Sequence, residues 1–114
     1  MVKEFNEEKP VVIGQKPVLL DFYASWCGPC RVTSNNIDKF ADAHPDVDIY
    51  KINVDEYEFL AEEYNVMSLP TVICVQTPED SEITEGFVNL LPGQIIYSYD
   101  IKTKKFIKQG WRND

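Results

Sequence analysis

Two cysteines separated by two residues are the part of this sequence best suited to do chemistry. Cys27 and Cys30 lie directly after an apolar run and before a segment with helical spacing. A helix N-terminus leaves backbone N–H groups unpaired and favours negative charge, so a thiolate is stabilised there. Between the two cysteines, Gly28 permits a tight turn and Pro29 fits a first helical turn, where its missing N–H is not needed. Because the thiolate is the nucleophile of disulfide exchange, the spacing predicts a redox pair in which Cys27 is the more exposed sulfur and Cys30, one turn deeper, can reach it to close a small disulfide.

Two other interpretations of the pair fit the sequence less well. A zinc site needs two further ligands, and only Cys74 and His44 are available, far apart in the sequence. A purely structural disulfide across two residues closes too small a loop to add much stability. Cys74 lies between apolar residues of a predicted strand and is expected to be a small buried side chain. We therefore expect no metal site.

The composition is typical of one globular domain. The chain has 114 residues, of which 44% are hydrophobic and 26% charged, so we expect a single domain over residues 1–114. The formal net charge of −8 argues against nucleic acid or anionic lipid as a partner, because both require basic patches. There is no apolar run long enough to span a membrane, and the first residues lack the apolar core of a signal peptide. We expect a cytoplasmic monomer.

The elements that must position the cysteines alternate between strand and helix. Residues 18–23 form an almost continuous apolar run, which is typical of a strand buried on both faces. Residues 28–43 carry apolar side chains at helical spacing, and Pro45 ends this helix. The further elements predicted are a strand over 47–54, a helix over 56–64 capped by Asp55, a strand over 71–75, and a strand over 82–88 in a hairpin with it. This order predicts an α/β domain with a mixed sheet.

Both ends of the chain leave alternatives open. Near the N-terminus, either a short helix capped by Asn6 or a strand over 11–13 fits the residues. Toward the C-terminus, β-formers on either side of 102–104 favour a hairpin, whereas Pro92 at a first helical turn favours a terminal helix.

Asp21 is the one charged residue in the apolar run 18–23. A carboxylate in such a strand is costly unless it has a partner or a chemical task. Because the neighbours on both sides are apolar, we expect a functional role for Asp21 rather than exposure to solvent. Burial should raise its pKa toward neutrality, which suits a general base.

Two segments of the chain together resemble the thioredoxin family. Residues 21–31 are similar to its active-site segment, and residues 60–71 are similar to its second signature at the expected separation. With residues 51–55, the resemblance covers roughly residues 17–88. It implies the thioredoxin fold, with a central mixed β-sheet of four to five strands flanked by helices on both faces. It also implies a protein-disulfide reductase with no bound cofactor, acting on disulfide-containing substrate proteins and recharged by a thioredoxin-reductase-like electron donor.

The resemblance also assigns roles to individual residues. Asp21 matches the buried Asp that accepts the proton of the second cysteine, and Lys51 matches the Lys that pairs near it. Pro70 matches a cis-proline beside the disulfide, and Leu69 before it would offer backbone hydrogen bonds to an extended substrate. The remaining positions that match the substrate-docking surface are Trp26, Gly28, Pro29 and Gly86.

The sequence departs from the family in three places. Asn35 occupies the position of a proline that usually kinks the active-site helix, the turn over 77–80 lacks the usual glycine, and the region after Gly86 is longer than usual. Aligning Gly93 and Gln94 with the last helix of the family favours a helix within 92–109 over the hairpin. Two alternatives to a reductase are a specialised extracytoplasmic thiol oxidase, isomerase or thiol donor, and a non-catalytic adaptor that keeps the fold. The residues between the cysteines favour the reductant.

Overall fold

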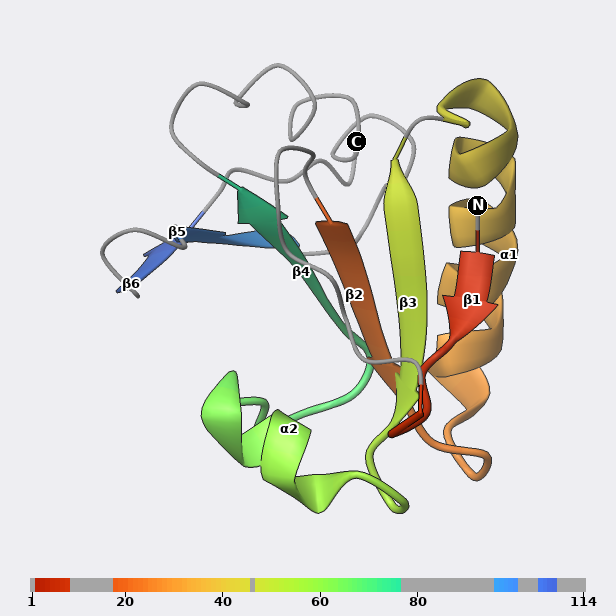
Figure 1. The fold of residues 1–114 in the computed structure, drawn as a ribbon. Helices are drawn as coiled ribbons and strands as arrows, with labels where there is room; N and C mark the ends of the chain where they lie inside the picture. Colours follow the sequence, from red (N-terminus) through yellow and green to blue (C-terminus); the bar gives the residue numbers. More distant parts are fainter. Residues whose placement is uncertain (1, 9–17, 46, 77–95, 101–104, 109–114) are drawn as a thin grey trace.

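The structure is a computed structural model that describes residues 2–8, 18–45, 47–76, 96–100 and 105–108 (Figure 1). These residues form one six-stranded sheet in the order β1-β3-β2-β4-β5-β6. The strands are β1 (Val2–Glu4), β2 (Val18–Tyr23), β3 (Asp48–Asn53), β4 (Thr71–Gln76), β5 (Ile96–Asp100) and β6 (Lys105–Lys108), and the helices are α1 (Gly28–Ala43) and α2 (Glu58–Glu63). The predicted α/β class with a mixed sheet is confirmed, with more strands than the four to five expected.

Strand direction divides the sheet. β1 and β2 both run parallel to β3, whereas β4 runs antiparallel to β2. β5 then pairs parallel with β4, and β6 pairs antiparallel with β5. The central position of β2 explains its nearly continuous apolar sequence, because a strand covered on both faces has little contact with water.

The two helices cover opposite faces of this sheet, as Figure 1 shows. Successive residues of a strand point to opposite faces. Leu19 accordingly packs with Ile37 and Phe40 of α1, whereas Leu20 packs on the other side with Leu60 of α2. Asp21 follows Leu20, so its side chain lies on the face covered by α1.

Helix α1 has the predicted bounds and passes through Asn35 without interruption. Its buried residues Cys30, Thr33, Ile37 and Phe40 follow one stripe against the sheet. The backbone N–H of His44 closes the helix on the carbonyl of Phe40 at 2.9 Å, just before Pro45.

We expect Ile37→Val to lower the free energy of unfolding by about 0.5–1.5 kcal/mol, because Ile37 is fully buried between α1 and the sheet. Urea titration followed by circular dichroism measures the change. Val32→Ala on the exposed side of the same helix is the matched control and should change stability by less than about 0.5 kcal/mol. Equal losses in the two variants would contradict this packing.

Two predictions about the elements are wrong, and one of the two alternatives left open near the N-terminus is excluded. Asp55 does not cap the second helix: α2 begins at Glu58 after Tyr57, with no side-chain cap, and the Asp55 carboxylate accepts a hydrogen bond from Trp26 instead. Asn6 does not cap a helix, since it forms a β-bridge after β1. The helix within 92–109 is replaced by β5 and β6, so local strand propensity prevailed over the alignment with the family helix.

The predicted strands over 11–13 and 82–88 and the turn over 77–80 lie outside the described residues. The strand that pairs with β4 on the side away from β2 is β5. In the part of the chain that the structure describes, no helix is long and apolar enough to cross a membrane.

Candidate functional site

The two cysteines lie at the start of α1, where β2 ends. They form a disulfide with a Cα–Cα distance of 5.4 Å. Cys27 is the N-cap residue, with an extended backbone (φ −88°, ψ 104°), and its Sγ accepts a hydrogen bond from the backbone N–H of Cys30 at 3.3 Å. A sulfur in this position is therefore held by the unpaired N–H groups and the positive end of the helix, both of which favour a thiolate.

Both cysteines are buried in the disulfide form. Cys27 is 6% exposed and Cys30 is 4% exposed, because both pack against Ala24 and the partly buried Val54 and Leu69. The residues around them supply the accessible surface instead: Gly28 and Pro29 are exposed, and Trp26 is 70% exposed. In the disulfide form Cys27 is thus the more exposed of the two residues by only a small margin.

Gly28 does not have the backbone role that the sequence suggested. It is the first residue of α1, its φ lies outside the left-handed region, and a Cβ built on it would meet nothing within 4 Å. The backbone therefore does not require glycine at this position. Because Gly28 has no side chain, the surface next to Cys27 stays open at this position.

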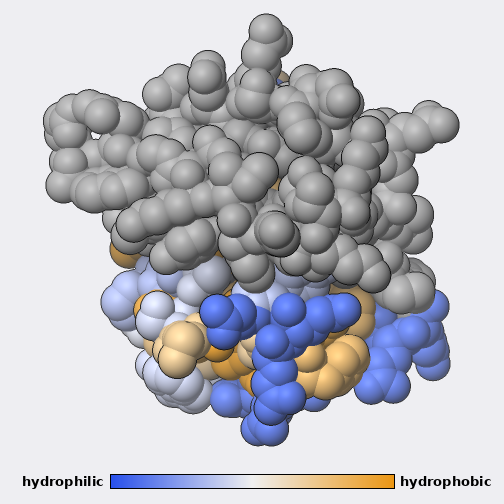
Figure 2. Space-filling model, turned by 90° about the vertical axis from the view of Figure 1, so that its left-hand side faces the viewer, coloured by the Kyte–Doolittle hydropathy of each residue, from blue (hydrophilic) through white to orange (hydrophobic). Residues whose placement is uncertain are grey.

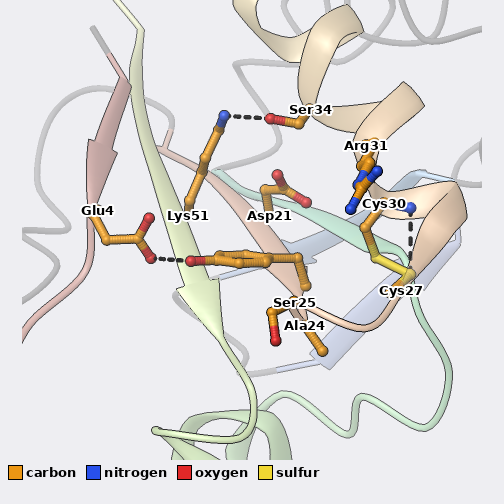
Figure 3. A pocket seen from close by; sticks show the side chains of 10 residues that line it. Glu4, Asp21, Ala24, Ser25, Cys27, Cys30, Arg31, Ser34 and Lys51 are labelled. Carbon is orange, nitrogen blue, oxygen red and sulfur yellow. Dashed lines mark hydrogen bonds between the residues drawn. A yellow bond between two sulfur atoms is a disulfide. The ribbon is translucent and has the colours of Figure 1, made fainter.

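Asp21 lies in the wall of a cavity of about 300 Å³ that both cysteines also line (Figure 3). The residue is 1% exposed, and its Oδ1 has no hydrogen-bond partner among the residues that the structure describes. Burial raises the pKa of Asp21 to about 7, the charge of Lys51 opposes that rise, and the charges of Glu4 and Asp38 add to it. A carboxyl group that exchanges its proton near neutrality and lines the same cavity as Cys30 has the properties of a general base.

Lys51 is next to Asp21 in the sheet but bonds elsewhere. The two residues are register partners in β2 and β3. The Lys51 ammonium nevertheless donates to the Ser34 hydroxyl of α1 (Figure 3). It also lies 3.5 Å from the carboxylate of Asp38 in the same helix. Lys51 thus connects β3 to α1 through its hydrogen bond and ion pair. Its expected interaction with Asp21 is an effect of its charge on the Asp21 pKa rather than a direct bond.

Glu4 and Tyr23 were not predicted as members of the site. Glu4 ends β1 and Tyr23 ends β2, and the Tyr23 hydroxyl donates to Glu4 Oε2 at 2.6 Å. Both side chains line the cavity with Asp21. Partial burial and this hydrogen bond raise the pKa of the Tyr23 hydroxyl above its ordinary value. The alternation of Asp21 and Tyr23 in β2 was the available signal, since it places both side chains on one face.

The loop before β4 forms the other side of the disulfide. The Leu69–Pro70 peptide bond is cis, as expected, and Leu69 packs against the cluster that contains Cys27 and Cys30. A second cavity of about 390 Å³ extends from Trp26 and Leu69 toward α2. The Trp26 indole N–H donates to Asp55 Oδ2 at 2.9 Å at the edge of this cavity.

The surface around α2 mixes apolar and hydrophilic residues, as Figure 2 shows for the described part of that face. Phe59 is 54% exposed and Met67 is 88% exposed. Gly86, the remaining predicted docking residue, lies outside the described residues. Cys74 is fully buried in β4 under α1, as expected, and takes no part in the site. The described residues contain no group of three His, Cys, Asp or Glu side chains that could hold a metal ion.

The sequence model of the thioredoxin family matches residues 2–91. The chain belongs to the thioredoxin family. It is 33% identical to thioredoxin of Mycoplasma genitalium over 76% of this chain and 85% of that one. It is 49% identical to thioredoxin of Alicyclobacillus acidocaldarius over 53% of this chain, and there it spans only 58% of the relative's length.

Solved thioredoxin structures are similar to this chain over about half of its length. Mitochondrial thioredoxin 3 from Saccharomyces cerevisiae, in its oxidised form, is 39% identical with a TM-score of 0.50, over 52% of this chain and 56% of that one. Thioredoxin-2, described as a component of the malaria parasite protein secretion machinery, is 32% identical with a TM-score of 0.53, over 56% and 63% of the two chains. The thioredoxin fold and the Cys27–Cys30 pair together make this chain a thiol–disulfide oxidoreductase.

Proposed function

We propose that this thioredoxin-family chain works as a reductant of disulfides in partner proteins. The observation that carries the proposal is the position of Cys27 Sγ as the cap of α1, within bonding distance of Cys30 and beside the cis Leu69–Pro70 bond. A nucleophilic sulfur, a second sulfur to resolve it and a loop for the substrate backbone thus occupy one place. The two residues between the cysteines favour a reducing pair.

The reaction begins with the dithiol form of the chain. The Cys27 thiolate attacks one sulfur of the substrate disulfide, and the other substrate sulfur leaves as a thiolate that takes up a proton. Cys30 then gives its proton to Asp21, and its sulfur attacks Cys27 Sγ. The first substrate sulfur leaves as a thiolate and is protonated in turn. The substrate gains two electrons and two protons, and the chain is left with the Cys27–Cys30 disulfide.

The residues around the pair have supporting roles in this proposal. Asp21 is the base, and the charge of Lys51 limits the rise of the Asp21 pKa that burial causes. The open surface at Gly28 and Pro29 lets a substrate backbone approach the disulfide, while Leu69 offers its backbone groups. Trp26 and Gly86 complete the docking surface.

The partners follow from this chemistry. The substrates are proteins with an accessible disulfide, and an electron donor similar to thioredoxin reductase restores the dithiol. We place the reaction in the cytoplasm, where thiols are kept reduced, because the cysteine content is one redox pair and one buried residue rather than a disulfide framework. We expect the chain to act as a monomer, which sedimentation equilibrium measures.

Cys30→Ser tests the proposal, because without the second sulfur the mixed disulfide cannot be resolved. After incubation with a disulfide-containing protein such as insulin, we expect the variant to accumulate a covalent adduct on Cys27 that wild type does not retain. Mass spectrometry detects the adduct and identifies the cysteine. The control is Cys27→Ser/Cys30→Ser, which should form none. If the Cys30→Ser chain remained unmodified, the proposed role as a reductant of protein disulfides would be contradicted.

A further inference from the structure

Three charged residues lie in a row across neighbouring strands of the sheet. Glu4 in β1 is the register partner of Lys51 in β3, and Lys51 is the register partner of Asp21 in β2. Register partners in parallel strands point to the same face, so all three side chains lie on the face covered by α1. The Lys51 ammonium contacts Ser34 and Asp38 of α1 rather than Glu4 or Asp21. The carboxyl groups of Glu4 and Asp21 therefore lie on the two sides of Lys51 in the sheet.

Glu4 has a fixed position at the cavity that contains Asp21. Its Oε2 accepts the hydrogen bond from the Tyr23 hydroxyl at 2.6 Å, and Tyr23 lies two residues after Asp21 on the same face of β2. Figure 3 shows the Glu4 carboxylate on the far side of Lys51 from Asp21. The cavity joins these side chains to Cys30, and Glu4 is exposed whereas Asp21 is almost fully buried.

We propose that Glu4, held at the cavity by the Tyr23 hydroxyl, is a positioning residue that acts through Asp21 on the transfer of the Cys30 proton. The negative charge of Glu4 favours the protonated form of the Asp21 carboxyl group. The inference rests on the proposed role of Asp21 as the base for Cys30. Tyr23 holds the exposed Glu4 carboxylate at the edge of the cavity, and from there its charge acts on the buried Asp21. Without that hydrogen bond, an exposed side chain would turn toward water and its charge would be screened.

The other charged groups that face Asp21 set the scale of the effect. Lys51 of β3 favours the ionised carboxylate, Asp38 of α1 opposes it, and Arg31 of α1 lines the same cavity. Burial is the largest cause of the raised pKa, with Glu4 adding to it. Glu4 therefore adds a smaller increase to the pKa of Asp21, which burial has already raised toward neutrality.

The test is the titration of Asp21 in the oxidised chain, followed by carbon NMR of carboxyl-labelled aspartate. The signal of Asp21 is identified by its absence from Asp21→Asn. Glu4→Gln removes the charge but keeps an acceptor for Tyr23. We expect it to lower the titration midpoint of Asp21 by about half a unit, below the roughly one to three units that a charge within about 4–6 Å causes.

Two further variants separate position from net charge. Glu8→Gln makes the same change of charge at an exposed residue outside the cavity, and it should leave the midpoint unchanged. Tyr23→Phe keeps the ring but frees Glu4, so we expect a fall in the same direction and smaller than that of Glu4→Gln. An unchanged midpoint in Glu4→Gln, an equal shift in Glu8→Gln or an unchanged midpoint in Tyr23→Phe would each overturn the inference.

Turnover distinguishes this inference from the proposed function. If Asp21 is the base, the pH at which mixed-disulfide resolution reaches half its maximal rate should fall in Glu4→Gln by the same amount as the NMR midpoint. Unchanged turnover in Asp21→Asn would refute the role of the base while the NMR shift still stood. Slow turnover in Asp21→Asn together with an unmoved midpoint in Glu4→Gln would refute the inference about Glu4 alone.

Discussion

Asp21→Asn should release its mixed disulfides about a hundredfold more slowly than the wild type at neutral pH. The amide cannot take the proton of Cys30, so the thiol must lose that proton to solvent before it can attack Cys27. A positioned general base typically contributes about 10²–10⁴-fold, and the lower end applies because a thiol ionises readily without help. Stopped-flow measurement of release from a fluorescent protein disulfide separates this second step from the first attack.

Asp42→Asn is the matched control for this experiment. It makes the same chemical change at an exposed residue of α1, outside the cavity that reaches the cysteines. Its release rate should equal that of the wild type. If Asp21→Asn released the substrate as fast as Asp42→Asn, another group would accept the proton of Cys30, and the assignment of Asp21 as the base would be wrong.

The same carboxyl group should make the stability of the oxidised protein strongly dependent on pH. The pKa of Asp21 is raised from 3.8 in the unfolded chain to about 7 in the folded one. Between these values the folded chain binds a proton that the unfolded chain has lost, so the free energy of unfolding falls as pH rises. The full loss is on the order of 4 kcal/mol, since each pKa unit corresponds to about 1.4 kcal/mol. It is absent below about pH 4 and complete above about pH 7.

Asp21→Asn isolates this effect, because its side chain does not ionise. Denaturant titrations of the oxidised wild type and variant from pH 4 to pH 8 measure the two stabilities. We expect the variant to gain on the wild type as pH rises, by about 4 kcal/mol across the whole window. Other carboxylates affect both chains equally and cancel in the difference. Parallel profiles would show that the folded environment does not raise the pKa of Asp21.

The central part of the fold was readable from the sequence because strong patterns coincide there. The buried run of β2, the spacing of α1 and the β-formers of β3 and β4 each fix an element without help from distant residues. β1 escaped prediction because three residues cannot show a period. The end of the chain was assigned wrongly where a family alignment was preferred to the strand propensity of β5 and β6.

The site shows the same division between local and distant information. Three features lie in short segments whose own sequence is sufficient to recognise them: the cysteine pair, the buried Asp21 and the cis Leu69–Pro70 bond. The bond of Lys51 to α1 and the contact of Tyr23 with Glu4 depend on which strands are neighbours and in which register. That information arises only when β1 and β2 are placed on either side of β3.

The sulfur of Cys27 also caps α1. The structural change between the dithiol and disulfide forms can therefore be confined to the first turn of this helix. The body of α1 is anchored by Ile37 and Phe40 against the sheet, well beyond the first turn that carries the cysteines. Gaining or losing two electrons can then leave the rest of the chain unchanged. A partner protein that must distinguish the dithiol form from the disulfide form can therefore do so only through contacts with the few atoms at the start of α1.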